Sequence, residues 1–355
     1  MMTENIQAFI ADQHMRLAEA MQKIDDNSNG ILFVIDENKC LCGAVSDGDI
    51  RRWLLKAGSI DAEIGLLMSS NPISIKKECD INALAFMREK CIRALPVVDD
   101  EGRIQNIYLA KLMEKKSDQV AEQLNNVSAV IMAGGKGTRL YPYTKILPKP
   151  LIPIGEVPIV ERVMDSFYEC GITDFIMTVN YRKHMIQSYF SETSKPYNIE
   201  YVEEDKPLGT GGSLKLIQRR FEKPLFVANC DSFVRTSYSD LYKYHLENSN
   251  AITMVTSLKN DTIPYGVVYS KENGELDHMV EKPTRSYLIN TGIYIINPKM
   301  IDLIPDDTMF HMTHLVDKAK KLGYKVGMFP ISEDSFLDMG EFAEMKRMEE
   351  KLNIQ

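Results

Sequence analysis

The segment best suited to phosphate chemistry is Ala133-Gly-Gly-Lys-Gly-Thr-Arg-Leu140, which directly follows an apolar run that we expect to be a strand. Its glycines lack a Cβ and let backbone N–H groups approach a polyphosphate or a base, and Arg139 can donate to phosphate oxygens at two places. The segment has neither the Gly-Lys-Ser/Thr of a P-loop nor the G-x-G-x-x-G spacing of a dinucleotide site. A glycine-rich turn alone is a weak signal, so its meaning depends on the motifs that come after it in the chain.

Further motifs follow in the order found in one enzyme family. Leu147-Pro-Lys-Pro-Leu-Ile-Pro-Ile-Gly155 comes shortly after the glycine-rich segment, and together the two resemble the sugar-phosphate nucleotidyltransferases, or nucleoside-diphosphate-sugar pyrophosphorylases. The other motifs of this resemblance, which covers residues 128 to 345, are Pro207-Leu-Gly-Thr-Gly-Gly212, Asn229-Cys-Asp231, Tyr265-Gly266, Val280-Glu-Lys-Pro283, Asn290-Thr-Gly292 and Leu337-Asp-Met-Gly340. So many motifs in one order do not arise by chance.

The resemblance implies a role for each group of polar residues. Arg139 and Lys149 hold phosphates, and Asp231 and Asp338 bind magnesium. The family's usual Gly-Asp at the metal position is Cys230-Asp231 here, which changes the turn but keeps the carboxylate. The nucleotide is contacted by Ala133, Gly134, Gly135, Gly137, Thr138, Glu204 and Gly209, and the sugar phosphate by Gly266, Glu281, Lys282 and Asn290. Of these, Glu281 accepts sugar hydroxyls and Lys282 contacts the sugar phosphate.

These charged residues suit the reaction of that family. The phosphate oxygen of a sugar 1-phosphate attacks the α-phosphorus of a nucleoside triphosphate while pyrophosphate leaves, so catalysis consists mostly of alignment and charge neutralisation. Two carboxylates hold a hard cation, and lysine and arginine offset the repulsion between two anionic reactants. We therefore expect a magnesium-dependent transferase without a protein nucleophile. The alternative for Asp231 and Asp338 is that they cap helices.

The residue that reads the base in this family lies just before the Pro-Leu-Gly-Thr motif, where thymidylyl and uridylyl transferases carry glutamine. Here the sequence is Glu203-Glu204-Asp205. A carboxylate only accepts hydrogen bonds, and guanine presents adjacent donors at N1 and N2 that can occupy it. The arrangement E-x-x-P-L-G-T also resembles mannose-1-phosphate guanylyltransferases. We therefore predict GTP as the donor, read by Glu204, with Glu203 as the less favoured reader.

The first 120 residues contain two similar segments, shifted by 63 residues. In each, two short apolar runs are joined by a turn and followed by a helical pattern, as expected of buried strands. The runs are Ile31–Asp36 and Gly43–Ser46 in the first segment, and Leu95–Asp99 and Ile104–Tyr108 in the second. Such a pair resembles the tandem cystathionine-β-synthase (CBS) domains of a Bateman module, which implies α+β domains at residues 1–63 and 64–120.

The CBS resemblance singles out Ser46 and Asp49, in the stretch Gly43-x-Val-Ser-x-x-Asp49. In that family the hydroxyl and the carboxylate hold the ribose of an adenine nucleotide, and a helix N-terminus adds N–H groups for phosphate. The second segment has Leu109 and Leu112 at these positions, so at most one such site is expected. Ser46 and Asp49 could equally cap a helix, so a regulatory nucleotide and a structural role both remain open.

The sugar is indicated only by the domain arrangement. A CBS pair fused to such a transferase resembles the glucosamine-1-phosphate guanylyltransferases of bacterial legionaminic acid synthesis, which implies GDP-glucosamine as a precursor of a nonulosonic acid in surface glycans. Mannose 1-phosphate and a heptose 1-phosphate remain open. Another alternative is a catalytically inactive, nucleotide-sensing subunit. Retention of the charged residues of the motifs favours the enzyme; they are Arg139, Lys149, Asp231, Glu281, Lys282 and Asp338.

Alternating strands and helices must position these residues. Strands are predicted at 128–133, 175–179, 199–202 and 224–228, and helices at 159–167, 183–190 and 211–220. Such alternation indicates parallel strands with crossover helices and a ligand site at the carboxyl ends of the strands. We predict an α/β, Rossmann-like catalytic domain over 126–355 with a mixed, mainly parallel sheet, after a polar linker at 114–127. A chain beginning near Asn125 is expected to fold and keep a basal rate.

Composition and charge argue against some partners. The net charge is −8 with a pI near 5.4, and no run of lysine and arginine occurs, so no nucleic acid is expected. No stretch approaches 18 apolar residues and the N-terminus lacks a signal pattern, so we expect no membrane and a cytoplasmic location. The six cysteines are expected to be reduced, with metal binding at Cys40 and Cys42 as the less favoured alternative. Because CBS pairs commonly associate, we expect a homo-oligomer.

Overall fold

The computed structural model describes residues 5–27, 29–57, 59–76, 83, 86–87, 90, 92, 94–109, 124–333, 335–340 and 342–351. Contacts between residues divide the chain into two compact units. The first unit contains Met1–Lys115, Ser257–Ile289 and Pro330–Asp334, and the second unit contains Lys116–Thr256, Asn290–Phe329 and Ser335–Gln355. The helical pattern expected after the second pair of apolar runs, which includes Leu112, and residues 114–123 of the predicted linker lie outside the described residues.

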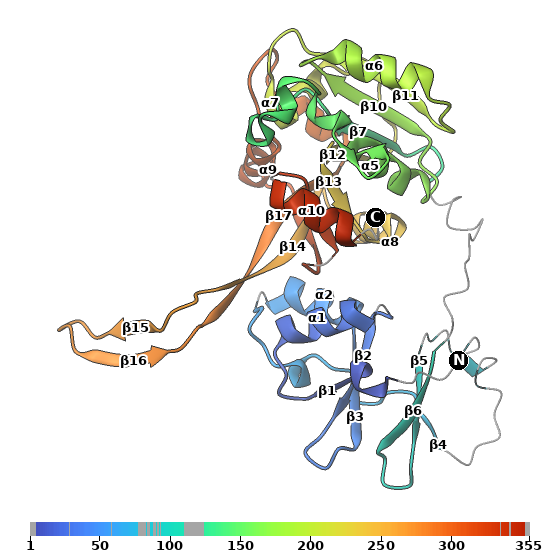
Figure 1. Cartoon of the computed structure of the whole chain (residues 1–355). Helices are drawn as coiled ribbons and strands as arrows, with labels where there is room; N and C mark the ends of the chain where they lie inside the picture. Colours follow the sequence, from blue (N-terminus) through green and yellow to red (C-terminus); the bar gives the residue numbers. More distant parts are fainter. Residues whose placement is uncertain are drawn as a thin grey trace. The chain divides into compact units, whose positions relative to one another are not determined.

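A seven-stranded sheet forms the centre of the second unit (Figure 1), in the order β11-β10-β7-β12-β17-β14-β18. Neighbouring strands are parallel from β11 to β12, and β12 pairs antiparallel with β17. The predicted mixed, mainly parallel sheet is confirmed, and the four predicted strands are correct to within one residue at each end. The strands are β7 (Ser128–Met132), β10 (Asp174–Val179), β11 (Asn198–Glu203), β12 (Leu225–Asn229), β14 (Ile252–Thr262), β17 (Thr284–Ile296) and β18 (Val326–Ile331).

Helices cover both faces of this sheet. On one face, Ile176 of β10 belongs to a buried cluster that it shares with α9 (Met312–Lys321). On the other face, its neighbour Phe175 lies against Phe167 of α5 (Ile159–Tyr168), with the two ring centroids 6.5 Å apart. Because successive strand residues point to opposite faces, this alternation buries the sheet on both sides, as expected for crossover helices.

The other helices and the short strands complete the second unit. The pairing of β13 with β19 is antiparallel and joins segments that lie about a hundred residues apart in the sequence. These elements are α6 (Lys183–Glu192), α8 (Tyr238–Glu247), α10 (Phe342–Lys351), β8 (Pro153–Ile154), β9 (Val157–Pro158), β13 (Ser232–Val234) and β19 (Phe336–Asp338).

The helix predicted over residues 211–220 is wrong in its extent. The structure has a single turn of helix, α7 (Gly209–Gly212), followed by a 3-10 turn at Ser213–Leu216. Ile217 then adopts an extended backbone with ψ of 112° and is buried in the core of the unit. Glycine has a low helix propensity, so the three glycines of α7 give the helix little tendency to continue. The packing of Ile217 into the core then ends it.

Two small sheets with the same topology form the N-terminal repeats of the first unit. In the first repeat, β2 pairs in parallel with β1 and antiparallel with β3; in the second, β5 pairs in the same way with β4 and β6. The register shifts at the same place in both, between Val34 and Ile35 and between Val97 and Val98. The predicted repeat is therefore confirmed. Its elements are β1 (Ile10–Asp12), α1 (Leu17–Asn27), β2 (Ile31–Ile35), β3 (Leu41–Ser46), α2 (Asp47–Ala57), β4 (Ile75–Lys76), β5 (Ala94–Val98) and β6 (Ile104–Leu109).

A segment from the later part of the sequence joins the core of the first repeat. Leu258, which is 1% exposed, belongs to the buried cluster that contains Leu17 and Ile50, and Leu288 packs against this cluster. Between Leu258 and Leu288, the strands β15 (Val267–Ser270) and β16 (Leu276–Val280) form an antiparallel ribbon. The first unit is thus built from N-terminal residues together with this inserted segment.

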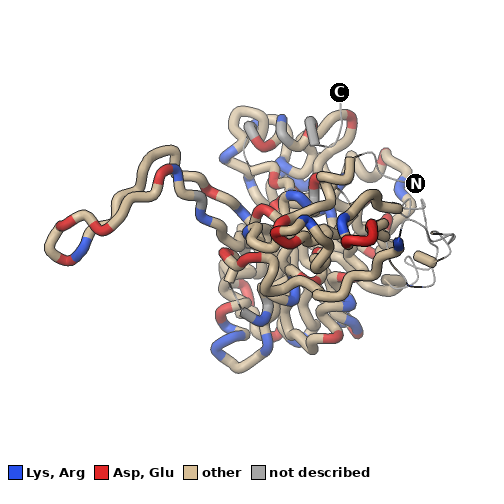
Figure 2. Tube along the Cα trace, turned by 90° about the horizontal axis from the view of Figure 1, so that it is seen from below, with Lys and Arg blue, Asp and Glu red and all other residues tan. Residues whose placement is uncertain are grey.

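Acidic and basic residues are interspersed along the described chain (Figure 2), without a long continuous stretch of lysine and arginine. None of the described helices combines the length and the apolar character needed to span a bilayer.

The described cysteines are free thiols, namely Cys40, Cys42, Cys170 and Cys230. The Sγ atom of Cys40 donates to the carbonyl of Glu101 at 3.0 Å, and that of Cys42 donates to the carbonyl of Val34 at 3.3 Å. The two thiols of the C-x-C pair thus have separate partners. Cys79 and Cys91 lie outside the described residues.

Candidate active site

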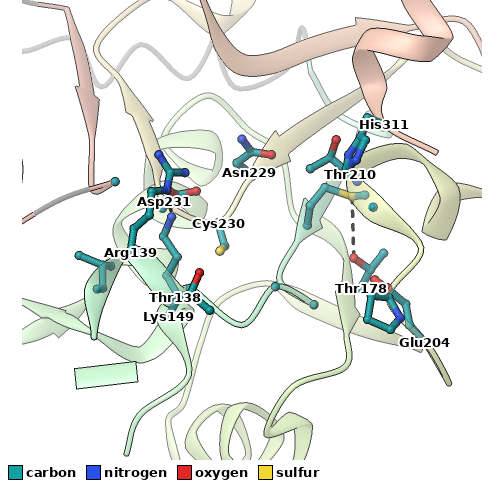
Figure 3. A pocket seen from close by; sticks show the side chains of 18 of the residues that line it. Thr138, Arg139, Lys149, Thr178, Glu204, Thr210, Asn229, Cys230, Asp231 and His311 are labelled. Atoms are coloured by element: carbon teal, nitrogen blue, oxygen red, sulfur yellow. Dashed lines mark hydrogen bonds and ion pairs between the residues drawn. The ribbon is translucent and has the colours of Figure 1, made fainter. Parts of the chain in front are cut away.

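A cavity of about 400 Å³ opens at the carboxyl ends of β7, β10 and β12 (Figure 3), and all of its lining residues belong to the second unit. This is the edge at which α/β sheets bind ligands. The predicted residues that line it are Gly134, Gly135, Gly137, Thr138, Arg139, Lys149, Glu204, Gly209 and Asp231.

Other predicted residues do not line this cavity. Ala133 is 1% exposed, and its N–H continues the pairing of β7 with β10 by donating to the Thr178 carbonyl at 2.9 Å. Asn290 is exposed, with its Oδ1 accepting from the Gly292 N–H at 3.1 Å. Gly266, Glu281 and Lys282 belong to the first unit, where they flank the β15–β16 ribbon and are exposed.

The glycine-rich turn after β7 fits closely around two side chains from other segments. A Cβ on Gly134 would lie 2.6 Å from Oε1 of Glu204, and a Cβ on Gly137 would lie 2.9 Å from the Cβ of Lys149. Gly137 also has a φ of 63°, in the left-handed region that favours glycine. Gly135 has open space around it. Glycine is therefore required at 134 and 137 for the turn to reach Glu204 and Lys149.

Asp231 and Asp338 come from distant segments that the pairing of β13 with β19 brings together, with Ser232 opposite Asp338. The ammonium group of Lys149 forms an ion pair with Asp231, and the two side chains are 14% and 10% exposed. Burial is the largest single effect and lowers the pKa of Lys149, but the charge of Asp231, its hydrogen bond to the ammonium group and the charge of Asp338 together raise the pKa. Burial and the charge of Asp231 raise the pKa of Asp338 to about 6. One lysine thus faces two carboxyl groups.

The paired carboxylates fit a magnesium ion. Burial first, and repulsion from Asp231 second, raise the pKa of Asp338, and a hard divalent cation held by oxygens of both groups relieves this repulsion. Magnesium is usually held by one or two carboxylates, with water and substrate phosphates as its remaining ligands. Among the described residues, no group of three or more His, Cys, Asp and Glu side chains is placed to hold a metal ion. Asp231 and Asp338 would therefore hold the ion.

The cavity has two chemically different sides (Figure 3). Arg139, Lys149 and Asp231 lie on one side, and Thr178 and Glu204 lie on the other. A Cβ on Gly340 would lie 3.0 Å from Oδ2 of Asp338 and 3.5 Å from Nη1 of Arg139, so the guanidinium is close to the carboxylate pair. Charged groups for phosphates and a metal are therefore grouped apart from Glu204.

Glu204 is a buried carboxylate, 6% exposed, directly after β11. It accepts a hydrogen bond from the Leu208 N–H at 3.1 Å, and burial raises its pKa, which this hydrogen bond opposes in part. Glu203 is exposed and does not line the cavity; its carboxylate accepts from Lys183 at 2.6 Å and from Gln187 at 3.1 Å. Of the two candidate readers of the base, Glu204 is thus the one in the cavity.

Four polar side chains of the cavity wall were not singled out from the sequence. Thr178 and Asn229 lie at the carboxyl ends of β10 and β12, where the rule for parallel strands would have found them. Thr210 lies within the Pro-Leu-Gly-Thr motif. His311 lies just before α9, and no pattern in its surrounding sequence marks it.

The turn that precedes α7 is bonded to the segment before α9. The Phe310 N–H donates to the Leu208 carbonyl at 2.8 Å, and the Phe310 carbonyl accepts from the N–H groups of Gly211 and Gly212 at 2.9 and 2.8 Å. These hydrogen bonds join two segments about a hundred residues apart in the sequence. The cavity wall beside Glu204 is therefore a fixed backbone structure.

Ser46 and Asp49 are close together at the start of α2 in the first unit. Oδ2 of Asp49 accepts from the Ser46 N–H at 2.9 Å and from the Ser46 hydroxyl at 2.6 Å, and the Asp49 N–H donates to the Ser46 hydroxyl at 3.2 Å. Arg52 forms an ion pair with the other oxygen of Asp49. This is the geometry of a helix cap. Ribose binding by the same pair stays a prediction. Leu109, which corresponds to Ser46 in the second repeat, is the last residue of β6.

Comparisons with known proteins agree with this architecture. A family model described as Nucleotidyl transferase matches residues 128–353, and the CBS domain model matches residues 1–56 and 62–108. The mannose-1-phosphate guanyltransferase of Aspergillus oryzae is 36% identical over 187 residues, which are 50% of this chain and 51% of that protein. The enzyme of the same name from Schizosaccharomyces pombe is 36% identical over 187 residues, 50% of this chain and 52% of that protein. The chain thus spans about half the length of these curated relatives.

A solved structure has the same fold. The crystal structure of HddC from Yersinia pseudotuberculosis has a TM-score of 0.51 and 26% sequence identity, and the match covers 64% of this chain and 99% of that chain. The match of the family model extends over more than half of the chain, and it begins at the strand that leads into the glycine-rich turn. The chain therefore belongs to the nucleotidyl transferase family, with a Rossmann-like α/β domain that follows a tandem pair of CBS domains.

Proposed function

We propose that the chain transfers GMP from GTP to a sugar 1-phosphate, with release of pyrophosphate. One observation carries the proposal: Glu204 and the group of Arg139, Lys149 and Asp231 lie on opposite sides of one cavity. A nucleoside triphosphate has a neutral base at one end and anionic phosphates at the other, so this separation suits its binding. The relatives named mannose-1-phosphate guanyltransferase support the same reaction class.

Glu204 accounts for the choice of base in this proposal. Its ionised carboxylate accepts two hydrogen bonds from N1–H and N2–H of guanine, while uracil and thymine offer one donor flanked by acceptors that repel it. The carboxylate is buried, so an unmatched base leaves it with the Leu208 N–H but without the two further donors that guanine supplies. This gives guanine an advantage over bases of the wrong donor pattern.

The opposite side of the cavity acts on the phosphates. Lys149 and Arg139 stabilise the negative charge that develops on the α-phosphoryl group as the sugar phosphate oxygen attacks and pyrophosphate leaves. Gly134, Gly135 and Gly137 let backbone N–H groups come close to phosphate oxygens. A magnesium ion held by Asp231 and Asp338 supplies further charge neutralisation when it is bound. The reaction needs no covalent intermediate on the protein.

The proposal extends to the sugar and to regulation. Gly266, Glu281, Lys282 and Asn290 are our candidates for binding the sugar phosphate. Glucosamine 1-phosphate is the first candidate substrate because of the fused CBS pair, and mannose 1-phosphate is supported by the names of the relatives; a heptose 1-phosphate is the third. An adenine nucleotide at Ser46 and Asp49 is proposed as the regulator, and association of the CBS pair as the basis of a homo-oligomer.

The experiment is a measurement of pyrophosphate release from ATP, GTP, CTP, UTP and dTTP with each of the three sugar 1-phosphates, in the presence of magnesium. GTP is expected to be the preferred donor, and the sugar that gives the highest kcat/KM identifies the acceptor. Asp231→Asn serves as the inactive control. Equal use of UTP or dTTP would contradict guanine selection, and no release from any pair would leave an inactive, nucleotide-sensing protein.

A further inference from the structure

His311 lines the cavity but has no part in the proposed function. It is half-buried and stands immediately before α9. Figure 3 shows it together with Thr210, on the side of the cavity that carries Glu204 and away from Lys149. An imidazole at the base end of a nucleotide cavity has a ring N–H or a ring nitrogen to offer to a base edge.

One short turn of backbone holds the His311 ring in place. The Thr210 N–H donates to Nδ1 of the ring at 3.4 Å. A Cβ on Gly209 would lie 3.0 Å from the same Nδ1, and Gly209 has a φ of 77°, so the ring packs directly on glycine backbone. The Met312 N–H donates to Oγ1 of Thr210 at 3.2 Å, which ties the residue after His311 to the same turn. The ring is therefore oriented before a ligand binds.

This contact favours one of the two neutral tautomers of the ring. A backbone N–H can only donate, so Nδ1 of His311 accepts from Thr210 and has no proton in the neutral ring. The proton then resides on Nε2. The His311 side chain also caps α9 by accepting a hydrogen bond from the backbone N–H of His314. The ring is thus an acceptor in both contacts, and none of the described residues accepts from its N–H. His311 thus presents one N–H donor that the fold itself does not use.

The same turn also holds Glu204. The Leu208 N–H donates to the Glu204 carboxylate and the Thr210 N–H donates to His311, so alternate amide groups of one turn fix both side chains. One of these side chains offers acceptors to the cavity and the other offers a donor. A ligand edge that meets both must carry donors and an acceptor next to each other.

Guanine has such an edge. When a carboxylate accepts from N1–H and N2–H, the carbonyl oxygen O6 lies beside N1 on the side away from N2 and needs a donor. Adenine has an amino donor at the same place, which repels an N–H group. We propose that His311 donates from Nε2 to O6 of guanine and is, with Glu204, a second determinant of base choice. This inference rests on the proposed function.

The test uses two variants and two nucleotide analogues. His311→Asn keeps an acceptor near the position of Nδ1 but has no donor near that of Nε2, whereas His311→Gln can place an amide N–H near Nε2. The analogue 6-thio-GTP replaces O6 by a sulfur that accepts hydrogen bonds poorly, and 7-deaza-GTP lacks the acceptor N7. Dissociation constants are measured by calorimetry on the full chain with magnesium, so that no sugar phosphate is needed.

Wild type is expected to bind GTP roughly tenfold more tightly than 6-thio-GTP, the effect of one hydrogen bond to a polar ligand group. His311→Asn is expected to bind both with equal affinity, and His311→Gln to recover part of the preference. Equal binding of GTP and 6-thio-GTP by wild type would overturn the inference, as would an unchanged ratio in His311→Asn.

Two further outcomes separate related ideas. Wild type and His311→Asn are also compared in their preference for GTP over 7-deaza-GTP. If His311→Asn loses this preference but keeps the preference for GTP over 6-thio-GTP, the donor meets N7 and the assignment to O6 is wrong. If wild type shows no preference for GTP over UTP, CTP and ATP, the proposed function fails instead. The melting temperatures of both variants are measured alongside. Should His311→Asn fail to fold, the ratio of the dissociation constants for 6-thio-GTP and GTP, measured in wild type and in His311→Gln, decides the matter.

Discussion

Oε1 of Glu204 lies 2.6 Å from the position that a Cβ on Gly134 would occupy. The same carboxylate is held by the Leu208 N–H at 3.1 Å and is almost fully buried. The glycine-rich turn and the side chain proposed to read the base are therefore packed against each other. A substitution in the turn displaces this carboxylate even though the two segments are about seventy residues apart in the sequence.

Gly134→Ala is expected to destabilise the chain by about 1–3 kcal/mol, because the methyl group displaces the buried Glu204 carboxylate from its hydrogen-bond partner. Gly135→Ala is the matched control, since a Cβ at this neighbouring position meets no atom within 4 Å. Thermal unfolding of both variants without ligand measures the difference. Equal melting temperatures for the two would contradict this packing of the turn against Glu204.

Glu204→Gln is expected to reduce the preference for GTP over UTP by about 1–3 kcal/mol, because it replaces one acceptor by a donor that faces a donor of guanine. Glu203→Gln is the control, as its carboxylate binds Lys183 and Gln187 outside the cavity. The measurement is kcat/KM for each nucleotide with the same sugar 1-phosphate. A loss of preference in the Glu203 variant alone would move the reading of the base to that residue.

Lys149→Met is expected to lower kcat/KM by roughly 10²–10³-fold, because it removes a preorganised charge at the phosphates together with the ion pair to Asp231. Lys183→Met, which breaks an ion pair outside the cavity, should have little effect. Steady-state rates of pyrophosphate release compare the two. A similar fall in both variants would show that the loss is not specific to the cavity.

The pKa of Asp338 gives the stability a defined dependence on pH. Its value of about 6 in the folded chain is higher than the ordinary 3.8, so this group favours folding below about pH 4 and loses that contribution as the pH rises through 6. In EDTA, the melting temperature of wild type relative to Asp338→Asn should fall between about pH 4 and pH 7.

Magnesium should reverse this trend, since the ion binds the deprotonated carboxylates. Its addition is expected to raise the melting temperature of wild type more at about pH 7.5 than at about pH 5. Asp338→Asn should respond weakly at both pH values. A stabilisation that is equal in the two proteins would place the ion elsewhere.

Asp49→Ala tests the proposed regulatory nucleotide. Wild type is expected to give heat with one of AMP, ADP and ATP in calorimetry, and Asp49→Ala to give none, because the carboxylate would accept from the ribose hydroxyls. Asp47→Ala is the control, since Asp47 is in the same helical turn and pairs with Arg51. Any effect of the nucleotide on the rate is expected to be modest. Equal heats from wild type and Asp49→Ala, or no heat from either, would leave Ser46 and Asp49 as a helix cap.

The strands and most of the cavity were predictable from the sequence because they depend on local patterns. Continuous apolar runs such as Ser128–Met132 identify buried parallel strands, and ligands bind where such strands end. Arg139, Lys149, Asp231 and Glu204, which the family resemblance assigned to one site, line one cavity. Family motifs alone indicated that Asp338 belongs beside Asp231, since the β13–β19 pairing joins distant segments.

The features that the sequence did not predict depend on tertiary contacts. The helix expected at 211–220 ends early because Ile217 packs into the core, which its local sequence does not reveal. His311 reaches the cavity because Phe310 binds the backbone of α7, a contact between segments about a hundred residues apart. The place of Leu258 in the core of the first repeat was unexpected for the same reason.

The position of Leu258 bears on how the chain can be divided. A chain beginning near Asn125 would lack Leu17, Ile50 and the rest of the cluster that buries Leu258 and covers Leu288. Both leucines would then face water at the base of a two-stranded ribbon, and exposed apolar side chains of this kind promote aggregation. The packing of Leu258 therefore revises the expectation that a chain beginning near Asn125 folds by itself. Such a chain is expected to be insoluble unless Leu258 and Leu288 are replaced by polar residues.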